Sequence, residues 1–221
     1  MYSECVKLHQ VTYWKKGGKT VFNRINWSVL KGERVLVMGN SDSGCKELFH
    51  LIAGYRPPQE GTVSVTGRLS VIRESFPLLE GMTLKDYFNL ALEASGERWK
   101  KKDTENFLKC HGLWEKREYK GENLTIEEQC RLQIAMSEIL KADVVIMEPC
   151  WKYMSDEDAK RYWSYVKERL DKKAVSFICF SDIRSLNLGD KDFSGLNWFT
   201  HIYILESGAL TEIRRGGSFE E

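Results

Sequence analysis

A glycine-bounded loop between an apolar run and a helical pattern is the segment best suited to chemistry. The loop runs from Gly39 to Gly44, follows the apolar residues Val35–Met38, and precedes a helical pattern over Cys45–Ala53 that stops at Gly54. A strand, a glycine loop and a helix in this order aim backbone N–H groups and the positive end of a helix at an anion. The segment therefore predicts a phosphate-binding loop.

The two side chains that complete such a loop are replaced. A working loop ends in a lysine for the terminal phosphates and a serine or threonine hydroxyl for Mg²⁺, and Cys45 and Lys46 stand at these positions. Because the positive end of a helix can lower a thiol pKa, a redox role is a further hypothesis for Cys45. The predicted cofactor-contacting segment is Gly39, Asn40, Ser41, Asp42, Ser43, Gly44, Cys45, Lys46 and Glu47.

The order of the other segments resembles the nucleotide-binding domain of ABC transporters over nearly the whole chain. A beta-rich segment, Val11–Gly32, precedes the loop, and Ile52–Val65 is similar to the helix end and strand that follow it in that family. The resemblance implies ATP and Mg²⁺ as cofactors, although the replaced residues argue against both. It also places Tyr13 and Trp14 near an adenine ring, whereas two edge strands with exposed aromatic side chains would explain these residues without a ligand.

Two acidic residues fall where the family contacts Mg²⁺. Glu74 stands at the glutamine position of the loop that senses the membrane partner, and Glu148 ends an apolar strand. Without gaps, Glu148 replaces the metal-binding aspartate and Pro149 replaces the glutamate that polarises water. This alignment is preferred because it also puts Ser155 at the aspartate position of the next loop. A one-residue deletion would instead match Glu148 to that glutamate and Met147 to the aspartate. In either alignment, a single carboxylate would have to both bind the metal and activate the water.

The segment that resembles the signature L-S-G-G-Q is Leu124, Thr125, Ile126, Glu127 and Glu128. In the family, the bare backbone of the two glycines approaches the γ-phosphate bound by the opposing subunit, and isoleucine and glutamate stand there in this chain. The same residues are typical of a helix start. Thr125 with Glu128 predicts a capping box, as does Thr83 with Asp86.

The switch position holds Ser181, directly before Asp182, where the family has a histidine at the end of a strand. Serine has neither the charge nor the reach of an imidazole. With Pro149 and Ser181 at these two positions, no residue is assigned a catalytic role.

The balance of charge and apolar residues limits the partners. Basic and acidic residues nearly cancel, with a net charge of +1, so we expect no nucleic acid. No apolar run approaches the length of a membrane span, so a transport role requires membrane-spanning partner subunits. We expect a cytoplasmic chain, peripheral on the inner face of the membrane. The family's sandwich dimer implies a second nucleotide-binding subunit, identical or different.

The predicted fold is α/β, a P-loop NTPase-like ABC nucleotide-binding domain. It has a mainly parallel sheet, an N-terminal antiparallel β portion and a helical subdomain. Residues 1–221 form one domain, divided into a β portion with the phosphate-loop core (1–74), a helical subdomain (75–135) and the second part of the core (136–221). The predicted function is an ATP-binding-type transporter subunit with a structural or regulatory role and no productive hydrolysis. The alternatives are an active ATPase, in which Lys46 reaches the phosphates and Glu148 handles metal or water, and a soluble scaffold protein.

Overall fold

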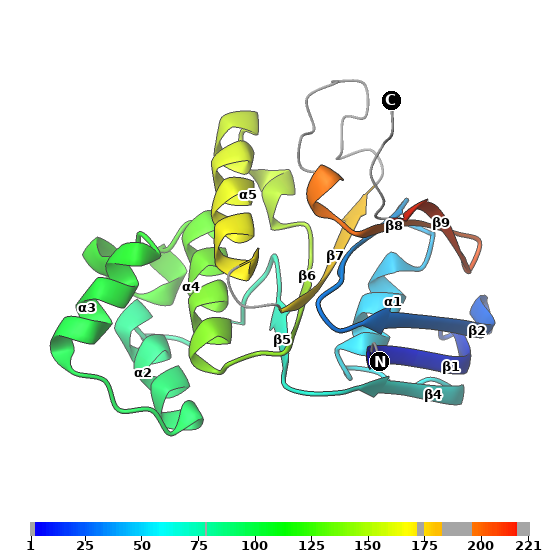
Figure 1. Cartoon of the computed structure of the whole chain (residues 1–221), viewed down its shortest axis with the longest axis horizontal. Helices are drawn as coiled ribbons and strands as arrows, with labels where there is room; N and C mark the ends of the chain where they lie inside the picture. The colour runs from blue at the N-terminus through cyan, green and yellow to red at the C-terminus, as the bar shows by residue number, and fades with distance from the viewer. Residues whose placement is uncertain (1–2, 78, 172–174, 183–195, 216–221) are drawn as a thin grey trace.

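The computed structural model describes residues 3–77, 79–171, 175–182 and 196–215 (Figure 1). The strands are β1 (Glu4–Trp14), β2 (Thr20–Leu30), β3 (Arg34–Gly39), β4 (Glu60–Val65), β5 (Leu69–Ile72), β6 (Val144–Met147), β7 (Ser176–Asp182), β8 (His201–Glu206) and β9 (Ala209–Arg215). The α-helices are α1 (Cys45–Ile52), α2 (Leu84–Ser95), α3 (Lys101–Cys110), α4 (Ile126–Ile139) and α5 (Asp156–Asp171). Short 3₁₀ turns are η1 (Trp114–Lys116), η2 (Gly121–Asn123), η3 (Cys150–Tyr153) and η4 (Leu196–Trp198).

A six-stranded sheet in the order β5-β6-β7-β3-β8-β9 forms the centre of the molecule. All neighbouring pairs are parallel except the β8–β9 hairpin. Gly208 lies in the turn of that hairpin with a φ of 78°. A side chain there would lie 2.1 Å from the carbonyl oxygen of Val21, so this close approach of two segments requires glycine. The predicted mainly parallel sheet is confirmed.

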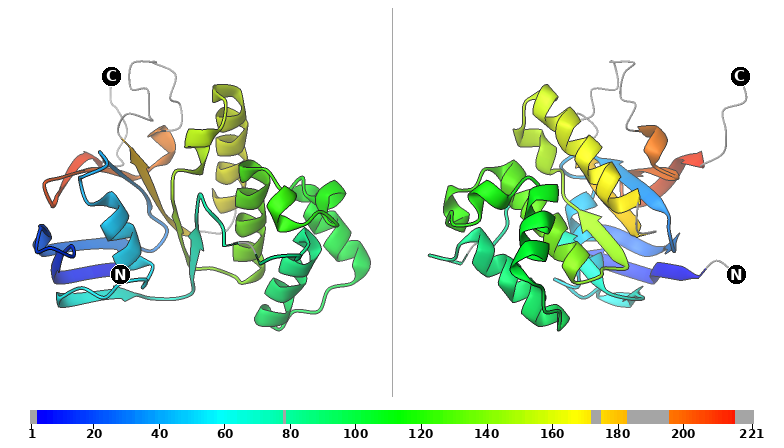
Figure 2. Two further views of the ribbon diagram at one scale, coloured as in Figure 1. Left: turned by 180° about the vertical axis from the view of Figure 1, so that it is seen from behind. Right: turned by 60° about the vertical axis from the view of Figure 1, so that its left-hand side comes forward.

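Alternate residues of the central strands bury their side chains on opposite faces of the sheet. In β3, Val35 and Val37 join the core that contains α1, whereas Leu36 and Met38 join the core that contains residues of α4 and α5. Figure 2 shows the sheet edge-on between these helices. Because both faces are covered, the strands are continuously apolar rather than alternating in sequence.

The N-terminal strands form a separate antiparallel sheet in the order β2-β1-β4, which confirms the predicted antiparallel portion. Helix α1 contacts β4 of this sheet as well as β3 and β7 of the central sheet. Its residues Leu48, Phe49 and Ile52 are buried in the shared core. Helix α1 is thereby packed against both sheets.

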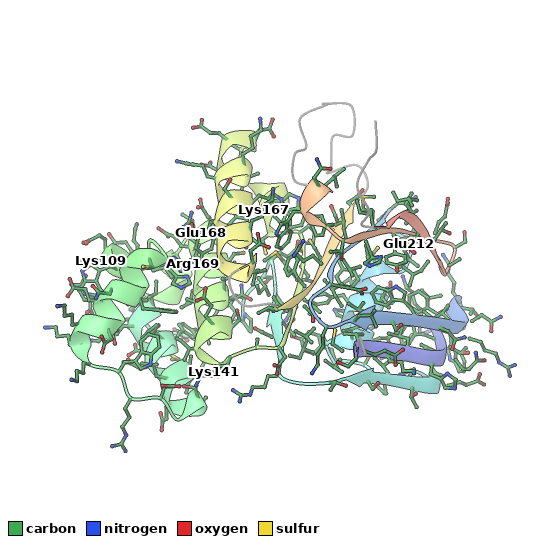
Figure 3. The ribbon with its side chains drawn as sticks, in the orientation of Figure 1. Lys109, Lys141, Lys167, Glu168, Arg169 and Glu212 are labelled. Carbon is green, nitrogen blue, oxygen red and sulfur yellow. The ribbon has the colours of Figure 1, made fainter. Side chains whose placement is uncertain are left out.

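Helices α2, α3 and α4 form a third cluster with its own buried core. Both predicted capping boxes, Thr83 with Asp86 and Thr125 with Glu128, are present with reciprocal hydrogen bonds. Arg169 of α5 donates a hydrogen bond to the backbone carbonyl of Cys110 and so ties α3 to the central core (Figure 3). The division at residues 75 and 135 stays a prediction, and α4 crosses residue 135 as one continuous helix.

Candidate nucleotide site

Several of the predicted site residues follow the carboxyl ends of the parallel strands. Gly39 ends β3 opposite Asp182 of β7, while Glu74 and Glu148 follow the paired ends of β5 and β6. Ser181 lies beside Met38 in the same register. In open α/β sheets, ligands bind outside the carboxyl ends of the strands. Segments distant in sequence therefore share one edge of the sheet where a ligand would be expected.

The predicted phosphate loop is bounded by two glycines that the structure requires. Gly39 has no room for a side chain, since a Cβ there would lie 2.2 Å from the Ser43 Oγ and 2.8 Å from the backbone oxygen of Leu205. Gly44 precedes α1 with a φ of 103° and gives the helix no side-chain cap. Gly44 itself has no side chain to cap α1, and the Ser43 hydroxyl accepts a hydrogen bond from the backbone N–H of Cys45 at 3.4 Å.

Cys45 brings a neutral thiol to the position of the phosphate lysine. Burial raises the pKa of this thiol to about 11, and the carboxylates of Asp182 and Glu47 add to the rise. The redox hypothesis, which required a lowered pKa, is wrong for this reason: desolvation outweighs the positive end of α1. The thiol stays protonated at neutral pH and supplies no positive charge to a phosphate.

Glu47 places a carboxylate in the first turn of α1, beside the loop. Its side chain is 10% exposed, and its Oε1 lies 2.9 Å from the Nζ of Lys15 in the turn between β1 and β2. A carboxylate is favourable at the positive end of a helix. It would, however, repel a phosphate bound to the same turn. This ion pair joins the phosphate loop to the segment that carries the predicted adenine-contacting residues.

The two aromatic residues of that segment have different surroundings. The ring of Tyr13 lies in the core, and its hydroxyl accepts a hydrogen bond from Arg56 at 3.0 Å. Trp14 is 39% exposed. An adenine ring can stack only on an accessible face, so Trp14 is the residue of the two that has surface to offer. Adenine contact at either position stays a prediction.

Glu148 and Glu74 are brought together as neighbours. The Oε2 of Glu148 accepts a hydrogen bond from the backbone N–H of Glu74 at 3.2 Å and lies 3.9 Å from the Nε of Arg73. Burial raises the pKa of Glu148, and the Glu74 carboxylate raises it further, while Arg73 and Lys46 oppose the rise. The carboxylate is thus a partly buried group with two cations already near it.

Gln133 of α4 holds this arrangement and was not found from the sequence. Its side chain is 4% exposed. The side-chain amide accepts a hydrogen bond from the backbone N–H of Arg73 at 2.8 Å and donates one to the Arg73 carbonyl at 2.9 Å. The guanidinium of Arg73 lies 5.6 Å from the centre of the Tyr55 ring. Only the fold brings these residues together, since no short-range pattern links positions 73 and 133.

The signature segment is engaged within its own helix. Glu128 completes the capping box with Thr125, and the carboxylate of Glu127 lies 2.7 Å from Arg131 one turn later. Arg131 in turn lies over the ring of Tyr165 in α5, 4.4 Å from its centre. Leu124 is buried and Ile126 is partly buried. These contacts give the segment a structural role in joining α4 to α5.

Pro149 and Ser181, at the two remaining predicted positions, have no side chain that could act as a general base towards water. Pro149 follows Glu148 and has no titratable side chain. Ser181 is 3% exposed, and its hydroxyl donates to the backbone oxygen of Asp182 at 3.2 Å. General-base work needs an acceptor that can reach water. At the end of β6, Glu148 is therefore the carboxylate left for such a task.

The comparison with known proteins decides the family. The family model described as ABC transporter matches residues 22–150, more than half of the chain. The chain belongs to the ABC transporter family. The ABC transporter ATP-binding protein YtrE of Bacillus subtilis (strain 168) is 23% identical over 93% of this chain and 96% of its own length. The ribose import ATP-binding protein RbsA of Halalkalibacterium halodurans is 25% identical over 74% of this chain, which spans 37% of RbsA.

Solved ABC domains confirm the predicted fold. A dimeric ATP-binding cassette in a post-hydrolysis state, bound to ADP and Pi, superposes with a TM-score of 0.75 at 16% identity, covering 95% of this chain and 99% of the other. A nucleotide-free ATP-binding cassette has a TM-score of 0.75 at 17% identity, covering 97% and 92%. The chain is thus an ABC-type ATP-binding domain in fold and family.

Domains of this family bind ATP and usually Mg²⁺, so the site must be tested for both. The backbone of the predicted phosphate loop suits a phosphate, because Gly39 and Gly44 keep side chains out of its two turns and the positive end of α1 lies beside it. The Mg²⁺ position does not fit, because Arg73 lies 3.9 Å from Glu148, the one predicted metal-binding carboxylate at the end of β6. Within the described parts of the chain, no group of three or more His, Cys, Asp or Glu side chains is arranged to hold a metal ion.

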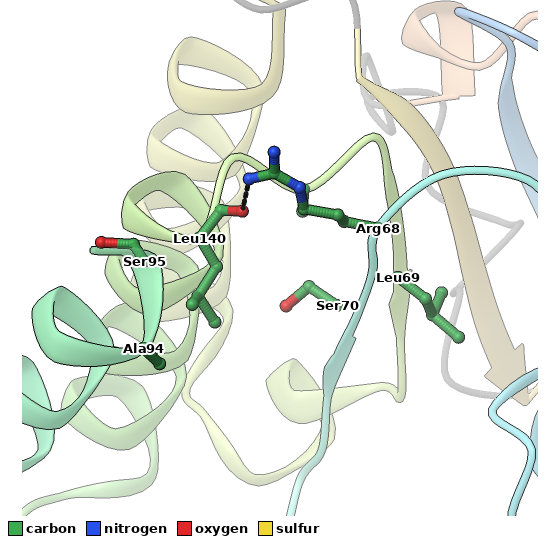
Figure 4. Close-up of a pocket in the computed structure, with 7 residues that line it drawn as sticks. Arg68, Leu69, Ser70, Ala94, Ser95 and Leu140 are labelled. Atoms are coloured by element: carbon green, nitrogen blue, oxygen red, sulfur yellow. Dashed lines mark hydrogen bonds between the residues drawn. The ribbon is translucent and has the colours of Figure 1, made fainter. Parts of the chain in front are cut away.

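A cleft of about 430 Å³ lies elsewhere, between the ends of α2 and α4 and the start of β5. In Figure 4 the guanidinium of Arg68 reaches the backbone oxygen of Leu140, a hydrogen bond of 3.0 Å. The cleft lies at the opposite end of β5 from Glu74, so it is separate from the phosphate loop. None of the helices in the described ranges is long and apolar enough to cross a membrane.

Proposed function

We propose that this chain is an ATP-binding-type subunit of an ABC transporter that binds nucleotide without hydrolysing it productively and that has a structural or regulatory role. The observation that supports this proposal most directly is the set of contacts around Glu148. Glu148 accepts the Glu74 N–H and lies beside Arg73, and the next residue is a proline, which has no carboxylate to polarise the attacking water. The neutral Cys45 and the inward-turned Ser181 support the same proposal.

The proposed ligand-contacting residues are the phosphate loop, 39–47, with Trp14 as the accessible aromatic residue. Glu47 lowers the expected affinity for phosphate, because its carboxylate shares the first turn of α1 with the loop. The proposed partners are membrane-spanning transporter subunits and a second nucleotide-binding subunit, identical or different. We propose a cytoplasmic location, peripheral on the inner face of the membrane.

A reconstituted complex tests this function. The tagged chain is purified in detergent together with its membrane-embedded partner, and ATP hydrolysis is compared for the wild type, Glu148→Gln, and Glu93→Gln as an exposed control on α2. The expected result is equal hydrolysis in the three complexes, with any activity supplied by the second nucleotide-binding subunit. Hydrolysis that disappears only in the Glu148→Gln complex would contradict the proposal.

A second candidate function is active hydrolysis with displaced ligands. It is favoured by one observation: the charge of Lys46 lowers the pKa of Glu148, so a cation lies within electrostatic range of this carboxylate. In that case, Glu148 would activate water and Lys46 would face the phosphates. The same Glu148→Gln complex separates the two functions, because an active site of this kind needs the carboxylate.

A further inference from the structure

We infer that Arg73 and Lys46 take the place of a divalent cation at Glu148, so that this chain holds a nucleoside polyphosphate in its metal-free form. The inference rests on the proposed nucleotide binding and adds the chemical form of the ligand. It follows because a magnesium site requires oxygen ligands, whereas cations lie near Glu148 at the carboxyl edge of the sheet.

One oxygen of the Glu148 carboxylate already has a hydrogen-bond donor and a cation beside it. The side chain is 14% exposed, so removing a nearby cation would leave a partly desolvated negative charge. Its Oε2 has a backbone N–H at 3.2 Å and the Arg73 Nε at 3.9 Å. A magnesium ion placed against this oxygen would stand close to a guanidinium, and the repulsion of the two cations opposes its binding.

The backbone of Arg73 is held by hydrogen bonds, and its guanidinium lies near both an aromatic ring and the Glu148 carboxylate. Gln133 holds both backbone groups of Arg73 at 2.8 and 2.9 Å, and the guanidinium lies 5.6 Å from the centre of the Tyr55 ring. Moving the arginine away would sacrifice its contacts with the ring and with the carboxylate. The permanent charge of a guanidinium also means that no change of pH in the physiological range removes it.

Lys46 adds a second cation on the side of the phosphate loop. It is exposed in the first turn of α1, and its charge acts on both Glu148 and His50 one turn later. A free polyphosphate carries more negative charge than its magnesium complex. It therefore gains more from Lys46 and Arg73 than the complex would. The hydroxyl that would bind magnesium is absent at position 46, and a lysine supplies positive charge there instead.

A direct metal titration of the purified chain tests the inference. Mn²⁺, a spectroscopic substitute for Mg²⁺, is titrated and followed by electron paramagnetic resonance for the wild type, Lys46→Ser, and Arg73→Gln/Lys46→Ser. The wild type is expected to show no saturable binding at Glu148. The double variant is expected to gain affinity by at least about tenfold, because two charges that repel the metal are gone. Adding Glu148→Gln to the double variant should abolish the gain.

Two results would overturn the inference. One is saturable Mn²⁺ binding by the wild type that Glu148→Gln removes, and the other is a folded double variant with no gain in affinity. Lys46→Ser alone keeps the test valid if the double variant does not fold, since the exposed Lys46 contributes little to packing. We expect this single change to raise the affinity for Mn²⁺ at least several-fold above that of the wild type. An unchanged affinity would count against the inference.

Nucleotide binding supplies the second measurement. ATP affinity is determined by calorimetry in EDTA and in excess Mg²⁺. The expected affinity is at least as high in EDTA, and tighter binding in Mg²⁺ would overturn the inference, as would no binding in either. These outcomes are independent of the proposed lack of hydrolysis, which is decided by the reconstituted complex. A metal-dependent but inactive chain and a metal-independent but active chain would thus be told apart.

Discussion

Glu47 in the first turn of α1 is paired with Lys15 from the turn between β1 and β2, with 2.9 Å between Oε1 and Nζ. This pair links the phosphate loop to the N-terminal sheet. It means that the first turn of α1 already has an acidic group of its own, before any phosphate binds. Stability and ligand affinity at the loop are therefore expected to oppose one another, because the carboxylate that suits the folded chain is unfavourable for an anion.

Loss of the Lys15 charge should destabilise the chain. We expect Lys15→Met to lower the free energy of unfolding by about 1–3 kcal/mol, because the carboxylate of Glu47, which is 10% exposed, loses its cation. Adding Glu47→Gln should recover most of the loss. The measurement is urea denaturation followed by circular dichroism. Lys16→Met, at an exposed neighbouring position, is the control, and an equal effect in both variants would rule out a role for the pair.

Cys45 should be slow to react with alkylating reagents. Its pKa of about 11, against 9.0 for an ordinary cysteine, reduces the thiolate fraction at neutral pH by about a hundredfold. We expect iodoacetamide to modify the exposed Cys110 well before Cys45 in the folded chain. Mass spectrometry of timed digests gives the order of modification. Preferential labelling of Cys45 would show that its thiol is activated after all.

These residues show what the sequence can predict and what it cannot. The helix start at Cys45 and the capping boxes at Thr83 and Thr125 follow from patterns within a few residues, and the structure contains each of these elements. The pKa of Cys45 depends on burial by distant segments, so the local helix end gave the wrong direction.

Contacts between distant segments account for most of what the sequence did not reveal. The pairing of Gln133 with Arg73 joins α4 to the loop after β5. Tyr13 illustrates a second cause. The pairing of β1 with β2 shifts register on both sides of this residue, so Val11, Thr12 and Tyr13 are buried in succession and Trp14 is the exposed aromatic. An irregular strand does not follow the alternation that a sequence pattern assumes.

The stability of the chain should depend on pH through Glu148. Its pKa is raised above 4.5, mainly by burial, so the folded state binds more protons than the unfolded state between 4.5 and the raised pKa. Stability contributed by this group therefore falls as the pH rises through that window. Glu148→Gln removes this dependence and can still accept the Glu74 N–H. We expect the stability of the variant relative to the wild type to increase as pH rises from 4.5, in urea denaturation at several pH values.

A stability of Glu148→Gln that falls relative to the wild type as the pH rises towards neutral would contradict the raised pKa. Glu93→Gln on the exposed face of α2 serves as the matched control, and its difference from the wild type should not vary in this way.

The capping box at the start of α4 should contribute to the stability of the chain. Thr125→Ala removes the hydroxyl that accepts the Glu128 N–H at 3.2 Å. The expected loss in the free energy of unfolding is about 1 kcal/mol. Thr125→Ser keeps the hydroxyl and should stay close to the wild type in the same urea titration. Equal losses for alanine and serine would mean that the methyl group, rather than the cap, is what the chain requires.

Gln133 should stabilise the backbone conformation at Arg73. Gln133→Met keeps the length of the side chain but leaves the N–H and the carbonyl of Arg73 without their buried partner, which should lower the free energy of unfolding by about 1–3 kcal/mol. Hydrogen exchange locates the effect, since exchange of the Arg73 amide should become faster. The amide of Glu148, which donates to the Ile72 carbonyl at 2.9 Å, should stay protected because that bond does not involve Gln133. A uniform rise at both amides would indicate general loosening of the fold, whereas a change confined to Arg73 would show that α4 positions the residue that meets Glu148.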